Sequence, residues 1–236
     1  MMNEDSTSIR GPVARRGLAA GFAVCAVATG TLLASHPSGG GGSFAERLKA
    51  EGANQVSDAF VHGGFIVTLC ALMVCFAIWS RMLVRMLDWA RVPVIVAMVT
   101  FCVGCGGLMA SMVVDGFASP AIAARFAAAG DPDSLANAKV LLIFCGTLIR
   151  ILMPLGLAMQ AAAMLSWSWV LVNAAGWSRA VGVFGAVCAI ASLILLLAFT
   201  DLSARLLPAV ILMQVIWYCG LAALLVRRCA SFPMSD

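Results

Sequence analysis

Two histidines are the side chains of this chain best suited to bind a metal ion or carry a proton. They are His36 and His62, and the sequence contains no other histidine. Asn54, Asp58 and His62 are spaced four residues apart, so a continuous helix would place all three on one face. Asp58 could then accept a hydrogen bond from the His62 ring, which fixes the tautomer and makes the free nitrogen a better ligand. Two interpretations stay open: a metal, haem or proton site that uses His36, His62 and Asp58, or a single helix-to-helix hydrogen bond from His62.

Arg150 is a basic side chain inside a long apolar run, flanked by leucine and isoleucine on both sides. An arginine at the centre of a bilayer costs from about 2.5 to more than 10 kcal/mol, so it must pair, line water or extend to the interface. Counted from the middle of the run, Arg150 lies roughly 9 Å toward the outer face. We expect an ion pair with Asp115 or Asp58. The candidate functional cluster therefore consists of His36, Asp58, His62, Asp115 and Arg150.

Other motifs that carry chemistry are absent or have a simpler explanation. Cys102 and Cys105 form a Cys-x-x-Cys pair, but glycine, alanine and serine surround them in an apolar run, which favours close helix packing. The sequence has no phosphate-binding glycine loop, no His-Glu-x-x-His zinc motif, no nucleophile elbow and no basic patch for nucleic acid. We therefore predict no catalytic residue and no nucleic-acid partner.

The elements that hold these residues must be membrane-spanning helices. Of 236 residues, 62% are hydrophobic and 11% are charged, and the mean hydropathy is +1.00. About a quarter of a soluble chain is charged, so this composition excludes a soluble domain. Barrel strands would alternate apolar and polar residues, a pattern that is missing here. The sequence predicts an all-α, polytopic integral membrane protein with six transmembrane helices in one bundle, about residues 17–35, 58–79, 92–114, 140–173, 180–200 and 207–226.

Two of these runs allow more than one interpretation. The run 140–173 is too long for one upright span and too short for two spans and a turn, which predicts one long, tilted or kinked helix; Pro154 followed by Gly156 supplies a physical cause for a kink. The alternative is a short interfacial helix through about Arg150, followed by a span from Ile151. The run 17–35 is expected to be an uncleaved anchor rather than a signal peptide, because bulky leucines precede its end.

Basic residues predict how the bundle is oriented. With a cytoplasmic N-terminus, nine of the 15 basic residues fall in inner segments and five in outer ones. The positive-inside rule therefore places both termini in the cytoplasm, and segments 36–57 and 115–139 outside a bacterial inner (plasma) membrane. Ser43 and Glu46 match a capping box that starts a helix in the first outer segment. Tryptophans are expected in a belt at the inner boundary, namely Trp79, Trp89, Trp167, Trp169 and Trp177.

Three functions fit this sequence. The protein could move a small solute or proton, with Arg150 in a polar cavity between helices. It could be a non-catalytic accessory or scaffolding subunit, with small-residue helix faces and no cavity. It could also be a haem- or metal-binding redox protein, if His36 and His62 converge. Only the third needs a cofactor, a haem or a metal ion. The expected partners are the lipid bilayer and either other membrane subunits or further copies of the chain.

Overall fold

The protein is a multi-pass bundle of six long apolar helices. The computed structural model describes residues 12–36, 42–129, 131–198 and 206–230, and this part of the chain contains no strand. Six helical stretches in it are long and apolar enough to cross a membrane: Val13–Ala34, Gln55–Met86, Asp88–Ala128, Pro132–Val172, Trp177–Ala198 and Leu206–Arg227. The predicted all-α fold with six spans is confirmed.

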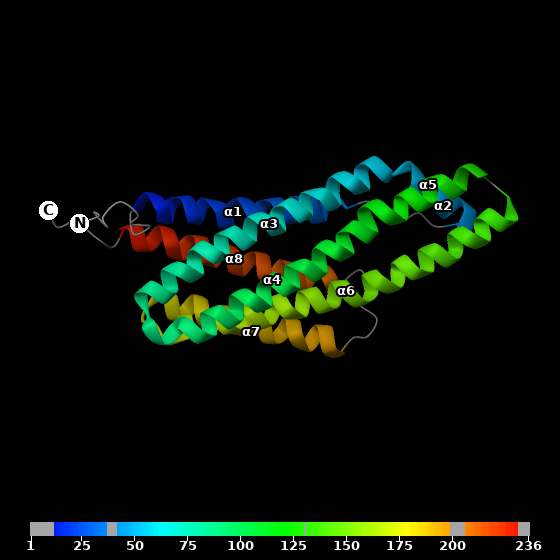
Figure 1. The fold of residues 1–236 in the computed structure, drawn as a ribbon. Coiled ribbons are helices and arrows are strands. Elements are labelled where there is room, and N and C mark those ends of the chain that lie inside the picture. Colours follow the sequence, from blue (N-terminus) through cyan, green and yellow to red (C-terminus); the bar gives the residue numbers. More distant parts are fainter. Residues whose placement is uncertain (1–11, 37–41, 130, 199–205, 231–236) are drawn as a thin grey trace, which may run out of the picture.

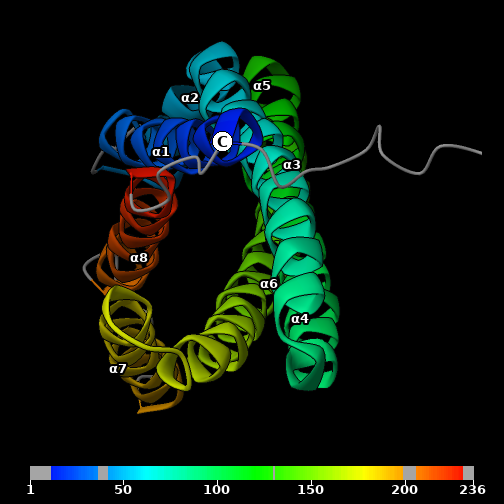
Figure 2. The same cartoon turned by 90° about the vertical axis from the view of Figure 1, so that its left-hand side faces the viewer.

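The six helices form a closed ring. They are α1 (Pro12–Ala34), α3 (Gln55–Met86), α4 (Arg91–Val113), α6 (Pro132–Val172), α7 (Trp177–Ala198) and α8 (Leu206–Ala230). Figure 2 shows the ring end-on, and each helix in this order contacts the next, with α8 closing against α1. Each helix therefore has one face toward the interior of the ring and one toward lipid.

An aromatic core fills part of the interior of the ring. Phe76 lies at its centre and stacks on Trp167, with ring centroids 4.2 Å apart. The indole N–H of Trp167 donates a hydrogen bond to the Ser80 hydroxyl at 3.1 Å. The complete set consists of Phe22, Phe76, Trp79, Phe101, Trp167, Trp217 and Tyr218, all of them buried. The predicted tryptophan belt is therefore wrong for Trp79 and Trp167, because hydropathy does not tell an interfacial ring from a core ring.

A small helical layer extends the bundle at the end away from the start of α1 (Figure 1). It consists of α2 (Phe44–Ala53), α5 (Ser119–Ala129) and the first turns of α6, around a core of Leu48, Ala123 and Ala138. The capping box of α2 is present, because Ser43 Oγ accepts from the Glu46 N–H and Glu46 accepts from the Ser43 N–H. We call this part the α2–α5 layer.

Two helices run farther than the sequence predicted. Residues 115–139 are almost wholly helical: α4 continues through the π-helix η3 (Val114–Ala118) into α5, and α6 then begins at Pro132. At the other end of α4, the short 3-10 helix η2 (Asp88–Ala90) joins it to α3. The helix α6 has 41 residues and continues through Pro154, as the single-helix interpretation predicted.

Candidate metal site

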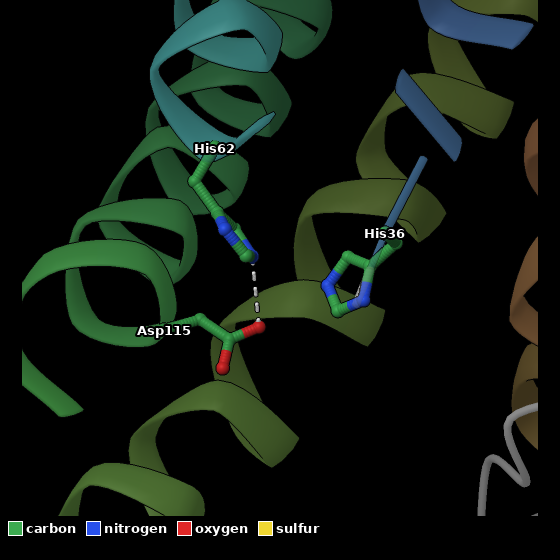
Figure 3. Close-up of side chains that lie close together, drawn as sticks. All are labelled: His36, His62 and Asp115. Carbon is green, nitrogen blue, oxygen red and sulfur yellow. Dashed lines mark hydrogen bonds and ion pairs between the residues drawn. The ribbon is translucent and has the colours of Figure 1, made fainter. Parts of the chain in front are cut away.

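Three side chains that can bind metal converge where the bundle meets the α2–α5 layer. They are His36 just beyond α1, His62 on α3 and Asp115 in η3 (Figure 3). One ligand atom from each lies within 4.8 Å of the other two. His62 Nε2 is 3.1 Å from Asp115 Oδ2, and the two imidazole rings meet edge to face with centroids 5.0 Å apart.

The helix α3 fixes the orientation of the His62 ring. Its Nδ1 is 2.9 Å from the backbone carbonyl oxygen of Asp58, one turn earlier. A carbonyl can only accept, so Nδ1 carries the proton and Nε2 faces Asp115. The sequence suggested that the Asp58 carboxylate would orient the ring, but the backbone carbonyl of the same residue does so. The effect on the ring is the same: its tautomer is fixed, with Nε2 as the nitrogen available for a ligand.

The π-helix sets the position of Asp115. In η3 the backbone N–H and the hydroxyl of Ser119 both donate to the carbonyl of Val114, five residues back, and the hydroxyl contact measures 3.0 Å. One extra residue in this turn rotates the residues before it relative to those after it, and such turns are frequent at functional sites. Gly116 lies directly against His62, where a Cβ would overlap the Cβ and ring of the histidine. The absence of a side chain at Gly116 therefore lets η3 approach α3.

The site is open on one side. His62 is buried, Asp115 has 31% of its side chain exposed, and His36 is exposed. His62, the most buried ligand, is therefore the one with a fixed orientation, and His36, the most exposed, lies just beyond the end of α1. An ion can reach the three side chains from the His36 side.

Two further carboxylates surround the site. Asp58 is buried, and both Asp58 and Glu51 on α2 interact electrostatically with His36, His62 and Asp115. Three acids around two histidines favour a cation over an anion. Glu51 does not follow from the spacing in the sequence, because α2 ends at Ala53 and helical spacing does not carry across the break to α3.

Arg150 lies outside this cluster. Among the described residues Asp115 pairs with His62, and no ion pair involves Arg150, so the expected pairing with Asp115 or Asp58 is wrong. The physical reason is the length of α6, about 61 Å at roughly 1.5 Å per residue, which is twice the hydrocarbon thickness. A span of about 20 to 25 residues counted back from Val172 ends between Met153 and Leu148. By this count, Arg150 falls at the outer end of a spanning segment of ordinary length, where an arginine needs no buried partner.

The charge of Glu51 predicts a pH effect on stability. Burial, and then the charges of Asp58 and Asp115, raise the pKa of Glu51 above its usual 4.5. The folded chain therefore holds this proton more tightly than the unfolded chain, and stability falls as pH rises through the window above 4.5. We expect metal-free Glu51→Gln protein to gain thermal stability relative to wild type between about pH 4 and 7 in detergent.

Glu46, on the same helix, provides the control of opposite sign. Its hydrogen bonds with the backbone and side chain of Ser43 lower the pKa of the Glu46 carboxyl. The ionised form therefore stabilises the fold, and this contribution is lost as pH falls. Glu46→Gln should lose stability relative to wild type as pH rises. Equal pH profiles for the two variants would contradict the assignment.

The geometry fits a single metal ion better than a haem. Edge-to-face contact between His36 and His62 leaves no gap for a porphyrin plane between them. Two ligands bound to one ion at about 2.1 Å lie roughly 3.0–3.4 Å apart at octahedral to tetrahedral angles, a range that includes the 3.1 Å between His62 Nε2 and Asp115 Oδ2. The ligand atom of His36 lies within 4.8 Å of the other two, so its exposed ring must move inward to bind the same ion. Two imidazoles and one carboxylate suit a divalent transition metal such as zinc, with coordination positions left for water. Comparison with known proteins found no similarity between this chain and a family model, a curated protein or a solved structure.

Proposed function

We propose that this multi-pass membrane protein binds a divalent transition-metal ion, with zinc as the reference ion, through His36, His62 and Asp115. The observation that carries the proposal is the convergence of one ligand atom from each residue within 4.8 Å. The surrounding carboxylates of Asp58 and Glu51 add negative charge that favours a cation.

The hydrogen bonding of His62 implies that metal binding displaces a proton. Nδ1 already donates to the Asp58 carbonyl, so the contact between Nε2 and Asp115 needs a proton on Nε2 or on the carboxyl oxygen. A metal ion requires both ligand atoms deprotonated, and it takes the place of that proton. Binding therefore releases about one proton, and affinity rises with pH.

The metal is proposed to arrive from the outer aqueous phase of the cell membrane. The distribution of basic residues supports an outward orientation of the α2–α5 layer, and the exposed His36 gives access from that side. Three protein ligands leave coordination positions open, as in sites that exchange ligands. The proposed role is therefore capture of the ion at the membrane surface.

Passage of a solute through the ring has less support. That hypothesis required Arg150 in a polar cavity between spanning helices, whereas Arg150 lines an open cavity between α2 and α6. A separate internal cavity of about 50 Å³ contains Gln160 and Gln214, and Tyr218 of the aromatic core forms one wall. Beyond Tyr218, the next side chain of this packed aromatic core is Trp217, and the cavity is small, so binding at the surface is the better-supported function.

Zinc titration of the purified chain tests the proposal. The protein is prepared without a histidine tag and titrated by calorimetry in buffers of different ionisation enthalpy, which reports stoichiometry and proton release together. We expect one zinc per chain, with about one proton released. Asp115→Asn should weaken binding by about 10-fold or more, because the amide is a poor metal ligand. Asp133→Asn, at an exposed acid near the start of α6, is the matched control and should bind zinc like wild type. No saturable binding, or equal losses in both variants, would refute the site.

Bound zinc should also stabilise the fold. An ion present at 100 times its Kd adds about 2.7 kcal/mol to the free energy of unfolding. Thermal unfolding in detergent should therefore shift upward with zinc and return to its metal-free midpoint after addition of a chelator. A midpoint that does not respond to zinc would contradict binding to the folded state.

A further inference from the structure

A second cavity lies between α2 and the outer part of α6. It is open and has a volume of about 500 Å³. Its charged lining consists of three basic side chains, Arg47 on α2 and Lys139 and Arg150 on α6, and one acid, Glu51. The cavity therefore has two positive charges in excess.

Helical spacing places these side chains on the faces of α2 and α6 that line the cavity. Arg47 and Glu51 are one turn apart on α2, while Lys139 and Arg150 are three turns apart on one face of α6. Between the two α6 cations this face carries Leu142 and Ile143 near Lys139, and the small Gly146 and Thr147 near Arg150. None of the three basic side chains forms a hydrogen bond or ion pair with a described residue, so their donors are available to a ligand.

The cavity lies at the level where a phospholipid headgroup would lie. A span of about 20 to 25 residues counted back from Val172 along α6 ends near Arg150. The same count forward from Val92 along α4 ends between Ser111 and Gly116, so the outer boundary of the hydrocarbon region falls near these residues. On the membrane side of Arg150, α6 exposes apolar side chains that include Ile151 at 58% and Leu155 at 53%. A charged group in the cavity could therefore continue into an acyl chain along α6.

We infer that the α2–α6 cavity binds a phosphate group, and the apolar surface beside it favours an anionic phospholipid headgroup as the source. Guanidinium groups bind phosphate oxygens through paired hydrogen bonds, and a lysine adds a point charge. Basic pockets of this kind recognise headgroups at membrane surfaces. A phosphate group bound in this cavity accounts for the arginine in the long apolar run of α6. None of its three basic side chains is a ligand of the metal site, so the two sites can be tested separately.

Native mass spectrometry of delipidated protein with added lipid tests the inference. We expect one phosphatidylglycerol per chain and at least a 10-fold preference over phosphatidylcholine, which carries no net charge. The double variant Lys139→Gln/Arg150→Gln should lower the affinity for phosphatidylglycerol by at least 10-fold. Lys49→Gln is the matched control, because Lys49 is an exposed cation on α2 that does not line the cavity; it should behave like wild type. Equal binding of both lipids, or equal losses in the double variant and the control, would overturn the inference.

Titration with inorganic phosphate distinguishes a phospholipid headgroup from a soluble phosphate ester as the ligand of this cavity. Competition between inorganic phosphate and phosphatidylglycerol supports a phosphate site that takes a headgroup. Saturable binding of inorganic phosphate without lipid binding assigns the site to a soluble phosphate ester, while no binding of either ligand rejects it. Thermal unfolding of the double variant in detergent, compared with wild type, reports whether the fold is intact, independently of the metal site.

Discussion

Replacing His62 with alanine is expected to lower the zinc affinity of this chain by at least about 100-fold. Loss of a partner that only orients a ligand commonly costs 10- to 100-fold in metal affinity, and loss of the ligand itself should cost more. His62 is the buried ligand whose Nε2 is already held toward Asp115 by the hydrogen bond from Nδ1 to Asp58. The measurement is competition against a chromophoric chelator, at a pH where the wild-type site is saturated.

His36 provides an internal comparison for this result. Its ring is exposed and lies just beyond the last turn of α1, so ordering it on the metal offsets part of the gain from binding. We expect His36→Ala to cost about 10-fold, clearly less than His62→Ala. Thermal unfolding in chelator separates loss of the ligand from loss of the fold. A change below about threefold for His62→Ala in folded protein would be inconsistent with a metal site at this position.

Replacing Gly116 with alanine is expected to disrupt the same site without removing a ligand. The added methyl group would overlap the Cβ and ring of His62, so η3 and α3 must separate or the ring must rotate. Overpacking of this kind typically destabilises a protein by about 1–3 kcal/mol. A shift of about 1 Å between Asp115 and His62 would also spoil the metal geometry, so we expect at least a 10-fold loss of zinc affinity.

Gly106 provides the matched control on the same helix. It lies in α4, its position is exposed, and a Cβ there would meet nothing within 4 Å. Alanine replaces glycine in a helix with a gain of up to about 1 kcal/mol, so Gly106→Ala should be neutral or stabilising and should bind zinc normally. The two substitutions are chemically identical and are expected to differ in sign. If both variants unfold and bind zinc alike, close packing of Gly116 on His62 is not what holds the site together.

The sequence by itself determined the fold class and most of the local structure. Six apolar runs predicted six spanning helices, because in lipid the backbone must satisfy its hydrogen bonds within each segment. Ser43 and Glu46 predicted the start of α2, and the length of the apolar run 140–173, too long for one upright span and too short for two, predicted one long α6. These features depend on neighbouring residues within one helix, so spacing and composition suffice to find them.

Only the tertiary structure decided which polar side chains meet. Asp115 is 53 residues from His62 in sequence, and it reaches the ring because a π-helix changes the rotation of α4 and Gly116 permits close contact. Arg150 was expected in the same cluster, yet the length of α6 places it at the membrane boundary beside another cavity. Hydropathy tells which residues enter a membrane but carries no information on the rotation and vertical offset of one helix against another. Packing sets both, and the convergence of His36, His62 and Asp115 depends on them.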